Sequence, residues 1–246
     1  MRQRRLLVQV GVAAVLLGLL ALLANNLAVN LIRTGLGLGF GWLDRPAGFA
    51  LAETALPYAP SDSYLWALTI GWLNSLKVIT AGLVLATVLG VAAGAARSSN
   101  NRLLRILAGG YVALIRQVPL LLQLLFWYFV AFLGLPSVPI GGLIRLSNQG
   151  IQLLGLNLSV EFCAVLVGLT VFTGASIAEI VRGGINAVPR GQWEAFRSLG
   201  LGEGLGLRRI VLPQALPAIL PALTSQYLNL AKNSTLAIAV GYADLY

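Results

Sequence analysis

Long apolar stretches recur along this chain and limit the folds open to it more than any other feature. A helix needs about 20 apolar residues to cross a bilayer. Hydrophobic residues make up 58% of the 246 residues and charged residues only 10%, which excludes a soluble globular fold. The pattern predicts an all-α polytopic membrane protein. The expected spans, separated by more polar segments, are residues 6–24, 70–96, 103–135, 160–181 and 210–235.

Residue types that carry much enzyme chemistry are scarce. The chain has no histidine, and its single cysteine, Cys163, lies in an apolar run without a partner. A disulfide framework and a thiolate metal site are therefore excluded within the chain. The lack of the commonest general base argues against most hydrolytic mechanisms. The sequence also has no Gly-rich phosphate-binding loop ending in Gly-Lys-Ser or Gly-Lys-Thr, so we expect no bound cofactor.

The first apolar run follows a basic start. Arginines at three of the first five positions precede residues 6–24, a pattern shared by signal peptides and by first membrane spans. The run is longer than the usual apolar region of a signal peptide and has an indifferent cleavage site, which favours a retained span. Residues 25–69 then form an extramembrane segment, either partly interfacial or a plain connecting loop, because Pro46, Pro57 and Pro60 break any long helix.

Three isolated charges accompany the later runs. Lys77, about two turns into the second run, is expected to extend to the outer interface, with substrate contact as the alternative. Arg116 lies deep in the third run, where an arginine costs at least ~2.5 kcal/mol unless it faces a cavity or a partner. Pro119 follows it and predicts a kink or break. Glu179, near the end of the fourth run, is expected to pair with nearby arginines, with substrate contact as the alternative.

The last run is bent and then interrupted. Its three prolines, Pro213, Pro217 and Pro221, are spaced by four, so they share one helical face and leave backbone carbonyls without donors. The polar residues 232–235 follow before the sequence becomes apolar again. Two structures fit this pattern. One is a break facing a cavity, as transporters use for ions and zwitterions, and the other is a helix end at the outer surface.

Arginine placement predicts the orientation of the chain. With the first residue inside, eleven arginines fall on the cytoplasmic side and three on the outer side. This asymmetry places the N-terminus and the loop 182–209 in the cytoplasm, and it explains the +9 formal charge without a nucleic-acid partner. The inner set is Arg2, Arg4, Arg5, Arg97, Arg102, Arg105, Arg182, Arg190, Arg197, Arg208 and Arg209, and the outer set is Arg33, Arg45 and Arg145.

The loop 182–209 carries the most specific pattern in the chain. Residues 192–199 are predicted to form a short helix that begins near Pro189 and ends at Gly200. Helical spacing places Trp193, Phe196 and Leu199 on one face. Glu194 can pair with Arg197, three residues later. By itself, such a loop also fits an ordinary amphipathic helix between two membrane spans.

The spacing within residues 194–213 resembles a known docking loop. Glu194-Ala195-Phe196, Gly200 and Ile210-Val211-Leu212-Pro213 are arranged as in the cytoplasmic loop by which permease subunits of ATP-binding cassette (ABC) importers dock into a groove on their ATPase. A second alanine is usual where Phe196 stands, so a bulkier docking surface is expected. The resemblance implies an ATPase-docking set of Arg190, Trp193, Glu194, Ala195, Phe196, Gly200, Ile210, Leu212 and Pro213.

Residues 65–246 resemble the polar amino acid branch of these permeases. The resemblance depends on residues 71–75, 116–123, 179–184 and 232–236, and the first span with residues 45–49 resembles the general L-amino acid subgroup. It implies a type I importer core with an extra N-terminal helix, and with the final core helix missing. The implied substrate-binding set is Arg116, Gln117, Lys232, Asn233, Ser234 and Thr235. Gln117 and Val118 stand where asparagine and threonine are more usual.

The implied function is import of L-amino acids by alternating access, without covalent chemistry in this chain. The expected partners are ABC ATPase subunits, which would bind ATP and magnesium, a second identical or different permease subunit, and an extracytoplasmic amino acid-binding protein. The expected location is the bacterial inner membrane, with several spans. Alternatives from other classes are a channel, which would conduct without ATP, and a lipid-processing membrane enzyme, which would need intramembrane carboxylates beyond Glu179.

Overall fold

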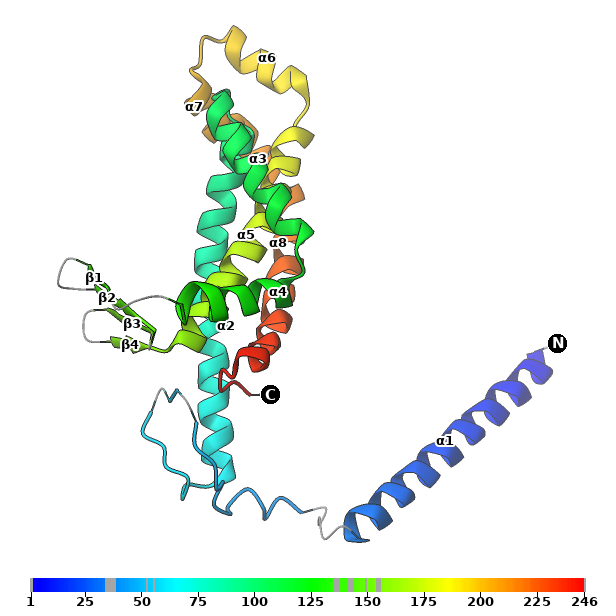
Figure 1. Cartoon of the computed structure of the whole chain (residues 1–246). Helices are drawn as coiled ribbons and strands as arrows, with labels where there is room; N and C mark the ends of the chain where they lie inside the picture. Colours follow the sequence, from blue (N-terminus) through cyan, green and yellow to red (C-terminus); the bar gives the residue numbers. More distant parts are fainter. Residues whose placement is uncertain are drawn as a thin grey trace.

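The computed structural model describes residues 2–33, 39–51, 53–54, 56–134, 138–140, 144–148, 150–153 and 156–245. Helices dominate the described part (Figure 1). The long helices are α1 (Arg2–Arg33), α2 (Tyr64–Arg97), α3 (Arg102–Gln117), α5 (Val160–Ala187) and α8 (Leu212–Asn233). The shorter helices are α4 (Leu120–Leu125), α6 (Arg190–Ser198) and α7 (Glu203–Gly206), with π-helical turns η1 (Phe126–Phe132) and η2 (Leu207–Val211) and the 3-10 helix η3 (Ser234–Val240).

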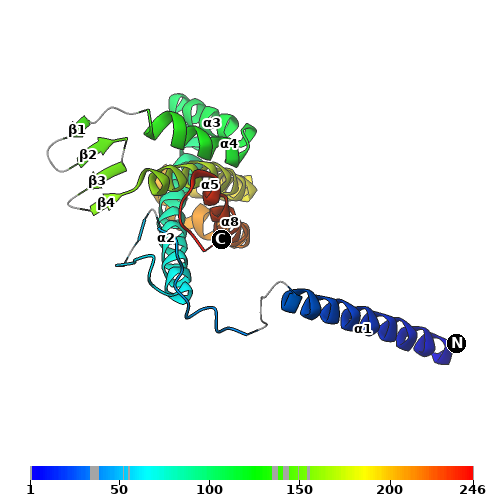
Figure 2. The ribbon, with the colours of Figure 1, turned by 60° about the horizontal axis from the view of Figure 1, so that its bottom comes forward.

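Three of the described helices are long and apolar enough to cross a membrane: α1 from Arg5, α2 and α5. A fourth is added if α3 and the helical stretch Leu120–Phe132, which meet at a bend of 105°, count as one span. The helix α8 is not in this set, because its prolines and polar side chains lower its hydropathy. It nevertheless runs beside α2 and α5 and packs on both (Figures 1 and 2), so the fifth span stays a prediction.

The helices α2 and α5 form the centre of the fold because glycines let them approach closely. A Cβ atom added to Gly90 would lie 2.5 Å from the Cβ of Ile177, and one added to Gly94 would lie 2.7 Å from the Cβ of Val181. Packing inside lipid depends on such close backbone contact. Gly90 and Gly94 therefore let α2 and α5 pack with their backbones close together.

The first span differs in length from its prediction. The helix α1 continues to Arg33 rather than ending at residue 24, and α2 begins at Tyr64 rather than at 70. Ser63 caps α2, since its Oγ accepts a hydrogen bond from the backbone N–H of Trp66 at 3.3 Å. The segment predicted over 25–69 is therefore shorter at both ends. Every residue from 5 to 24 is exposed, and α1 stands apart from the other helices (Figure 1).

A small antiparallel sheet lies in the more polar segment between the expected spans 103–135 and 160–181. Its strands β1 (Val138–Ile140), β2 (Ile144–Ser147), β3 (Gly150–Leu153) and β4 (Leu156–Leu158) pair in chain order, with Ser147 opposite Gly150. Gly150 has φ +122°, and a Cβ atom there would lie 2.0 Å from the carbonyl oxygen of Leu158. Strands of three or four residues show too little alternation to be predicted, and they are stable only as a set.

The helical bundle has two distinct ends (Figure 1). At one end, called the α6 end, α6 and α7 lie near the turn between α2 and α3. At the other, called the linker end, the described residues of the segment 39–63 (39–51, 53–54 and 56–63) lie beside the start of α2. That segment is held by side chains: the Tyr58 hydroxyl donates to the carbonyl of Phe49 at 2.8 Å, and the Trp66 indole N–H donates to that of Pro57 at 3.1 Å.

Candidate functional site

The helix α6 forms as its sequence predicts. Pro189 immediately precedes it with φ −55° and ψ 139°, and its carbonyl accepts from the backbone N–H of Gln192 at 2.9 Å. Gly200 follows the helix with φ +70°, in the left-handed region that a residue with a Cβ atom enters only with strain. The predicted start and end of this helix are confirmed.

The apolar face of α6 is only partly as expected. The Phe196 side chain is fully buried and Trp193 is half-buried, whereas Leu199 is 75% exposed. The placement of Leu199 on this face is wrong, because α6 ends at Ser198 and the backbone of Leu199 has left helical geometry. The expectation that Phe196 enlarges a docking surface is also wrong. Its ring points into the protein, where a partner cannot touch it.

The charged pair expected on α6 forms with a different partner. Arg197 donates through Nε to Oε1 of Glu203, at 2.8 Å, rather than to Glu194. The turn at Gly200 brings α7 back against the end of α6, which a spacing rule within one helix does not include. The hydrogen bond to Glu203 raises the pKa of Arg197, and the charges of Glu203 and Glu194 raise it further. Glu194 remains exposed.

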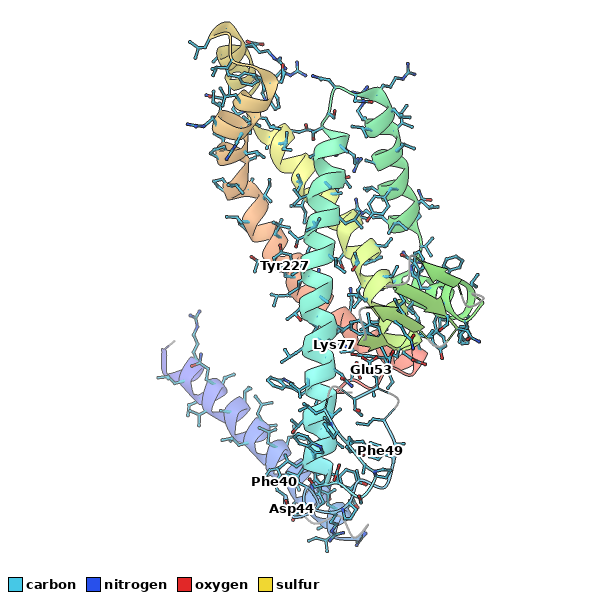
Figure 3. The ribbon with its side chains drawn as sticks, turned by 90° about the vertical axis from the view of Figure 1, so that its left-hand side faces the viewer. Phe40, Asp44, Phe49, Glu53, Lys77 and Tyr227 are labelled. Carbon is cyan, nitrogen blue, oxygen red and sulfur yellow. The ribbon has the colours of Figure 1, made fainter. Side chains whose placement is uncertain are left out.

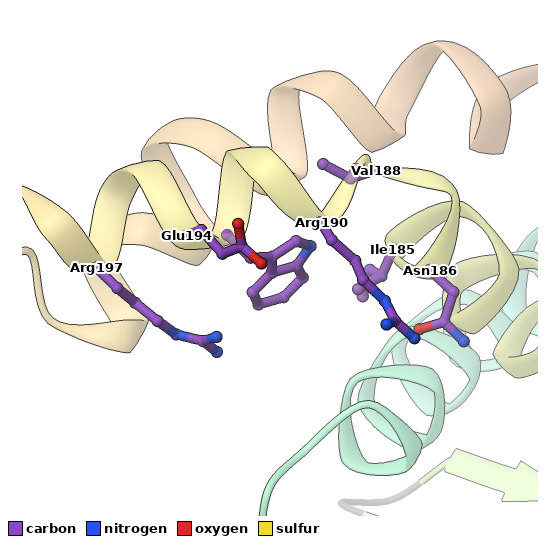
Figure 4. Close-up of a pocket in the computed structure, with 7 residues that line it drawn as sticks. Ile185, Asn186, Val188, Arg190, Glu194 and Arg197 are labelled. Carbon is purple, nitrogen blue, oxygen red and sulfur yellow. The ribbon is translucent and has the colours of Figure 1, made fainter.

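An open cavity of about 570 Å³, called the docking hollow, lies beside α6. Figure 4 shows Arg190 and Asn186 directed toward one another at one side of it, with Glu194 and Arg197 further along α6. A second hollow of about 380 Å³ lies between α6 and the α2–α3 turn. The docking hollow is lined by Ile185, Asn186, Val188, Arg190, Trp193, Glu194 and Arg197.

The expected docking residues divide into three groups in the structure. Those with exposed side chains or backbone are Arg190, Glu194, Ala195, Gly200 and Pro213, and those that are half-buried are Trp193, Ile210 and Leu212. Phe196 alone is buried. A partner can therefore contact eight of the nine.

Glu179 pairs with two arginines, as expected. It forms ion pairs with Arg97, the last residue of α2, and with Arg182, one turn further along α5 at 2.5 Å. The three side chains tie the ends of α2 and α5 together beside the second hollow. Glu179 is therefore a structural partner of arginines.

The break at Pro119 is present. The helix α3 ends at Gln117, and the chain turns by 105° into α4. Gln123 bridges the break, because its Nε2 donates to the carbonyls of Ile115 at 2.9 Å and Val118 at 2.8 Å. The sequence did not single out Gln123, although carbonyls freed by a proline require donors.

The expected substrate residues lie apart from one another. Arg116 and Gln117 are exposed at the end of α3, and Lys232 is exposed near the end of α8. The α-helix ends at Asn233 and a 3-10 helix begins at Ser234, a change that fits both a break facing a cavity and a helix end, so the two predictions stay open. The hydroxyls of Ser234 and Thr235 donate to carbonyls of the preceding turn, each at 2.8 Å. Within the described residues, no hydrogen bond joins the Arg116 region to the residues 232–235.

A polar cluster at the linker end, called the Glu53 cluster, was not predicted. Lys77 forms an ion pair with Glu53, whose other carboxylate oxygen accepts a hydrogen bond from Ser159, and Figure 3 shows the side chains of Lys77 and Glu53 converging. Asn74, which is fully buried, donates to the carbonyls of Glu53 at 2.9 Å and Ala243 at 2.7 Å. Lys77 is therefore paired rather than extended to an interface. The cluster could have been anticipated from Lys77, because an unpaired charge in an apolar run is costly and therefore needs a partner.

Metal binding has no visible basis in the part of the chain that the structure describes. No group of three or more His, Cys, Asp or Glu side chains gathers there. The arrangement can dock a partner at the α6 end.

Comparison with protein families finds one matching model, described as "Binding-protein-dependent transport system inner membrane component", over residues 86–245. The chain is 32% identical to the General L-amino acid transport system permease protein AapQ of Rhizobium johnstonii, with 99% of this chain and 82% of that protein covered. That alignment runs over 327 positions, so AapQ has internal segments that this chain lacks. The Glutamate transport system permease protein GluD of Corynebacterium glutamicum is 34% identical over 77% of this chain and 63% of its own length.

Solved structures agree with these matches. A chain in the structure titled "Crystal structure of an amino acid ABC transporter with histidines" superposes with a TM-score of 0.58 at 30% identity, covering 74% of this chain and 75% of that chain. A chain of the MetNI methionine ABC transporter in an inward facing conformation gives a TM-score of 0.55 at 23% identity, covering 73% of this chain and 77% of its own. The second likeness shows a shared fold.

Proposed function

Because the chain belongs to the family of binding-protein-dependent transport system inner membrane components, it is a permease subunit, and we propose that it imports L-amino acids with an ABC ATPase docked on its α6 end. One observation carries the docking proposal. The helix α6 projects at the end of the bundle, with the exposed Arg190 and Glu194 beside a hollow of about 570 Å³ (Figures 1 and 4). A short helix beside an open hollow suits insertion into a groove.

The cargo and the other partners are proposed from the relatives. AapQ is named for general L-amino acid transport and GluD for glutamate transport, and the matches to them cover 99% and 77% of this chain at 32% and 34% identity. We infer an L-amino acid as cargo, an extracytoplasmic binding protein that delivers it, and a second permease subunit that completes the translocation path. The chain would lie in the bacterial inner membrane with its N-terminus in the cytoplasm, in accord with the arginine asymmetry.

Substitution of Gly200 tests docking. A Cβ atom at Gly200 would meet nothing within 4 Å, but φ is +70°, so alanine and tryptophan there share the same backbone strain while only tryptophan adds bulk at the surface. In proteoliposomes with the ATPase and binding protein, Gly200→Trp should hydrolyse ATP without amino acid uptake, and Gly200→Ala should keep most of the coupling. Normal coupling in Gly200→Trp would remove α6 from the docking surface, and uptake without ATP would indicate a channel.

Cysteine labelling tests the orientation. Ser61 lies in the segment 39–63 and Ser99 in the α2–α3 turn, at opposite ends of the bundle. The native Cys163 is buried, so it gives little background. In intact cells, Ser61→Cys should react with an impermeant thiol reagent and Ser99→Cys should not. Labelling of Ser99→Cys alone would reverse the proposed orientation.

The substrate site is proposed on Arg116, with contacts from Gln117, Lys232, Asn233, Ser234 and Thr235. Arg116 is exposed, so its planar guanidinium can grip both oxygens of an amino acid carboxylate. Arg116→Ala should abolish uptake without affecting assembly with the ATPase, and Arg116→Lys should rescue it only in part. Ser234→Ala or Thr235→Ala should weaken uptake. Transport by Arg116→Ala at the parent rate would assign the carboxylate contact to the other permease subunit.

A further inference from the structure

The backbone conformation of Gly206, the last residue of α7, does not require a glycine. Its φ of −61° and ψ of −44° are ordinary helical values, at which alanine would be the better helix former. A Cβ atom at this position, however, would lie 2.4, 2.5 and 2.6 Å from Cδ2, Cε2 and Cγ of Phe196. The phenyl ring thus lies directly against the backbone of Gly206, and no side chain fits between them.

The Phe196 ring is held on its other sides by the core. It is fully buried in an apolar cluster with Ile185 and Val188 at the end of α5, and with Val211 and Ala215 at the start of α8. A ring packed at this density cannot shift without moving its neighbours. Added bulk at Gly206 must therefore displace α6 itself.

The contacts around this ring join α6 to α8. The N–H of Leu201 donates to the carbonyl of Phe196 at 3.1 Å, and Arg197 binds Glu203 across the turn. From Gly206 the chain continues through η2 into α8, and Gln214 Nε2 donates to Gln192 Oε1 at 3.1 Å. The only fully buried side chain of α6 is thus seated on the segment that leads into α8, within the part of the chain that the structure describes.

We propose that Phe196 and Gly206 are positioning residues for ATPase coupling: the close fit of the Phe196 ring on Gly206 sets the position of α6 relative to the start of α8, so that displacement of α6 by the docked ATPase reaches α8. The helix α8 leads in turn to the change of helix type at residue 234, so a shift of α6 reaches the proposed substrate region through one continuous helix. This inference rests on the proposed function of α6. It also explains how the chain accepts a phenylalanine at position 196.

The test compares four variants in proteoliposomes that contain the ATPase and the binding protein: Gly206→Ala, Phe196→Ala, the double variant, and Gly204→Ala. Gly204 is a matched control, because it lies in the same helix and a Cβ atom there would meet nothing within 4 Å. The readouts are amino acid taken up per ATP hydrolysed and the thermal midpoint of each variant in nanodiscs. If Phe196 and Gly206 had only a structural role, uptake per ATP would fall in the same order as the thermal midpoint across the four variants.

We expect the variant that loses the most thermal stability to differ from the variant that loses the most uptake per ATP. Phe196→Ala leaves a cavity and should lower the thermal midpoint more, whereas Gly206→Ala displaces α6 and should lower uptake per ATP about tenfold. The double variant removes the clash and should regain most of that loss, while Gly204→Ala should stay within about twofold of the parent.

Three results would overturn the inference: normal coupling in Gly206→Ala, a double variant no better than Gly206→Ala, or coupling that follows the thermal midpoint across the set. Failure of the proposed function looks different, because the parent chain itself would then show no ATP-dependent uptake.

Discussion

The helix α6 at one end of the bundle and the segment 39–51 at the other are held to it by opposite kinds of interaction. At the α6 end, an apolar ring, Phe196, is buried between helices, and the nearby Arg197–Glu203 pair is about half exposed. At the linker end, the Glu53 cluster joins residues up to 169 positions apart through buried or half-buried polar groups. A closely packed apolar ring passes any displacement on to its neighbours, whereas directional polar bonds fix one geometry. The difference assigns motion to the α6 end and anchoring to the linker end.

The largest effect on stability is expected from Phe196→Ala. Removing a buried phenyl ring should lower the free energy of unfolding by about 3–5 kcal/mol. Equilibrium SDS unfolding in mixed micelles would measure it. Leu199→Ala is the matched control, because Leu199 is 75% exposed and adjoins the same helix. Equal effects of the two substitutions would mean that burial of the ring does not hold the α6 end.

Asn74→Ala should have the next largest effect and tests the polar anchor. The substitution leaves the carbonyls of Glu53 and Ala243 without their donor in a buried place, at a cost of about 2–3 kcal/mol. Asn229→Ala, at an exposed position of α8, should be close to neutral. Hydrogen exchange of the segment 39–51 should rise in Asn74→Ala but not in Asn229→Ala. Unchanged exchange would show that the segment is anchored elsewhere.

Glu53→Gln should destabilise the protein by about 1–2 kcal/mol, since the carboxylate is largely buried beside Lys77 and the amide keeps only part of its bonding. A double-mutant cycle with Lys77→Met isolates the pair. A coupling energy of about 1 kcal/mol is expected, with little dependence on salt. Additive effects of the two substitutions would show that the ion pair contributes nothing of its own.

Arg197→Ala should have the smallest effect on stability. Arg197 and Glu203 are 51% and 53% exposed, and exposed ion pairs contribute little because water and salt screen them. No measurable change in unfolding is expected, with or without 0.5 M salt added. A clear loss of stability would contradict the contrast between the two ends, because it would make a surface charge part of the hold on α6.

Much of the α6 end was predictable because its determinants are local. Pro189 and Gly200 set the ends of one short helix, and Pro119 breaks another, through the geometry of their own backbones. The spacing of Glu194, Gly200 and Pro213 indicated the family, which the comparison confirmed. Two of the failures there, Leu199 and the partner of Arg197, arise where the turn at Gly200 changes the direction of the chain.

Composition and local backbone rules were enough to predict the membrane class, the first, second and fourth long apolar helices, the break at Pro119 and a short helix between Pro189 and Gly200, because each depends on composition or on neighbours within one turn. The small sheet, the inward direction of Phe196 and the pairing of Lys77 with Glu53 were set by the packing of the whole chain. These features require contacts between distant segments. The sequence shows that a charge in an apolar run needs a partner and that a large ring needs a cavity. Which residues supply them depends on the packing of α2, α5 and α8.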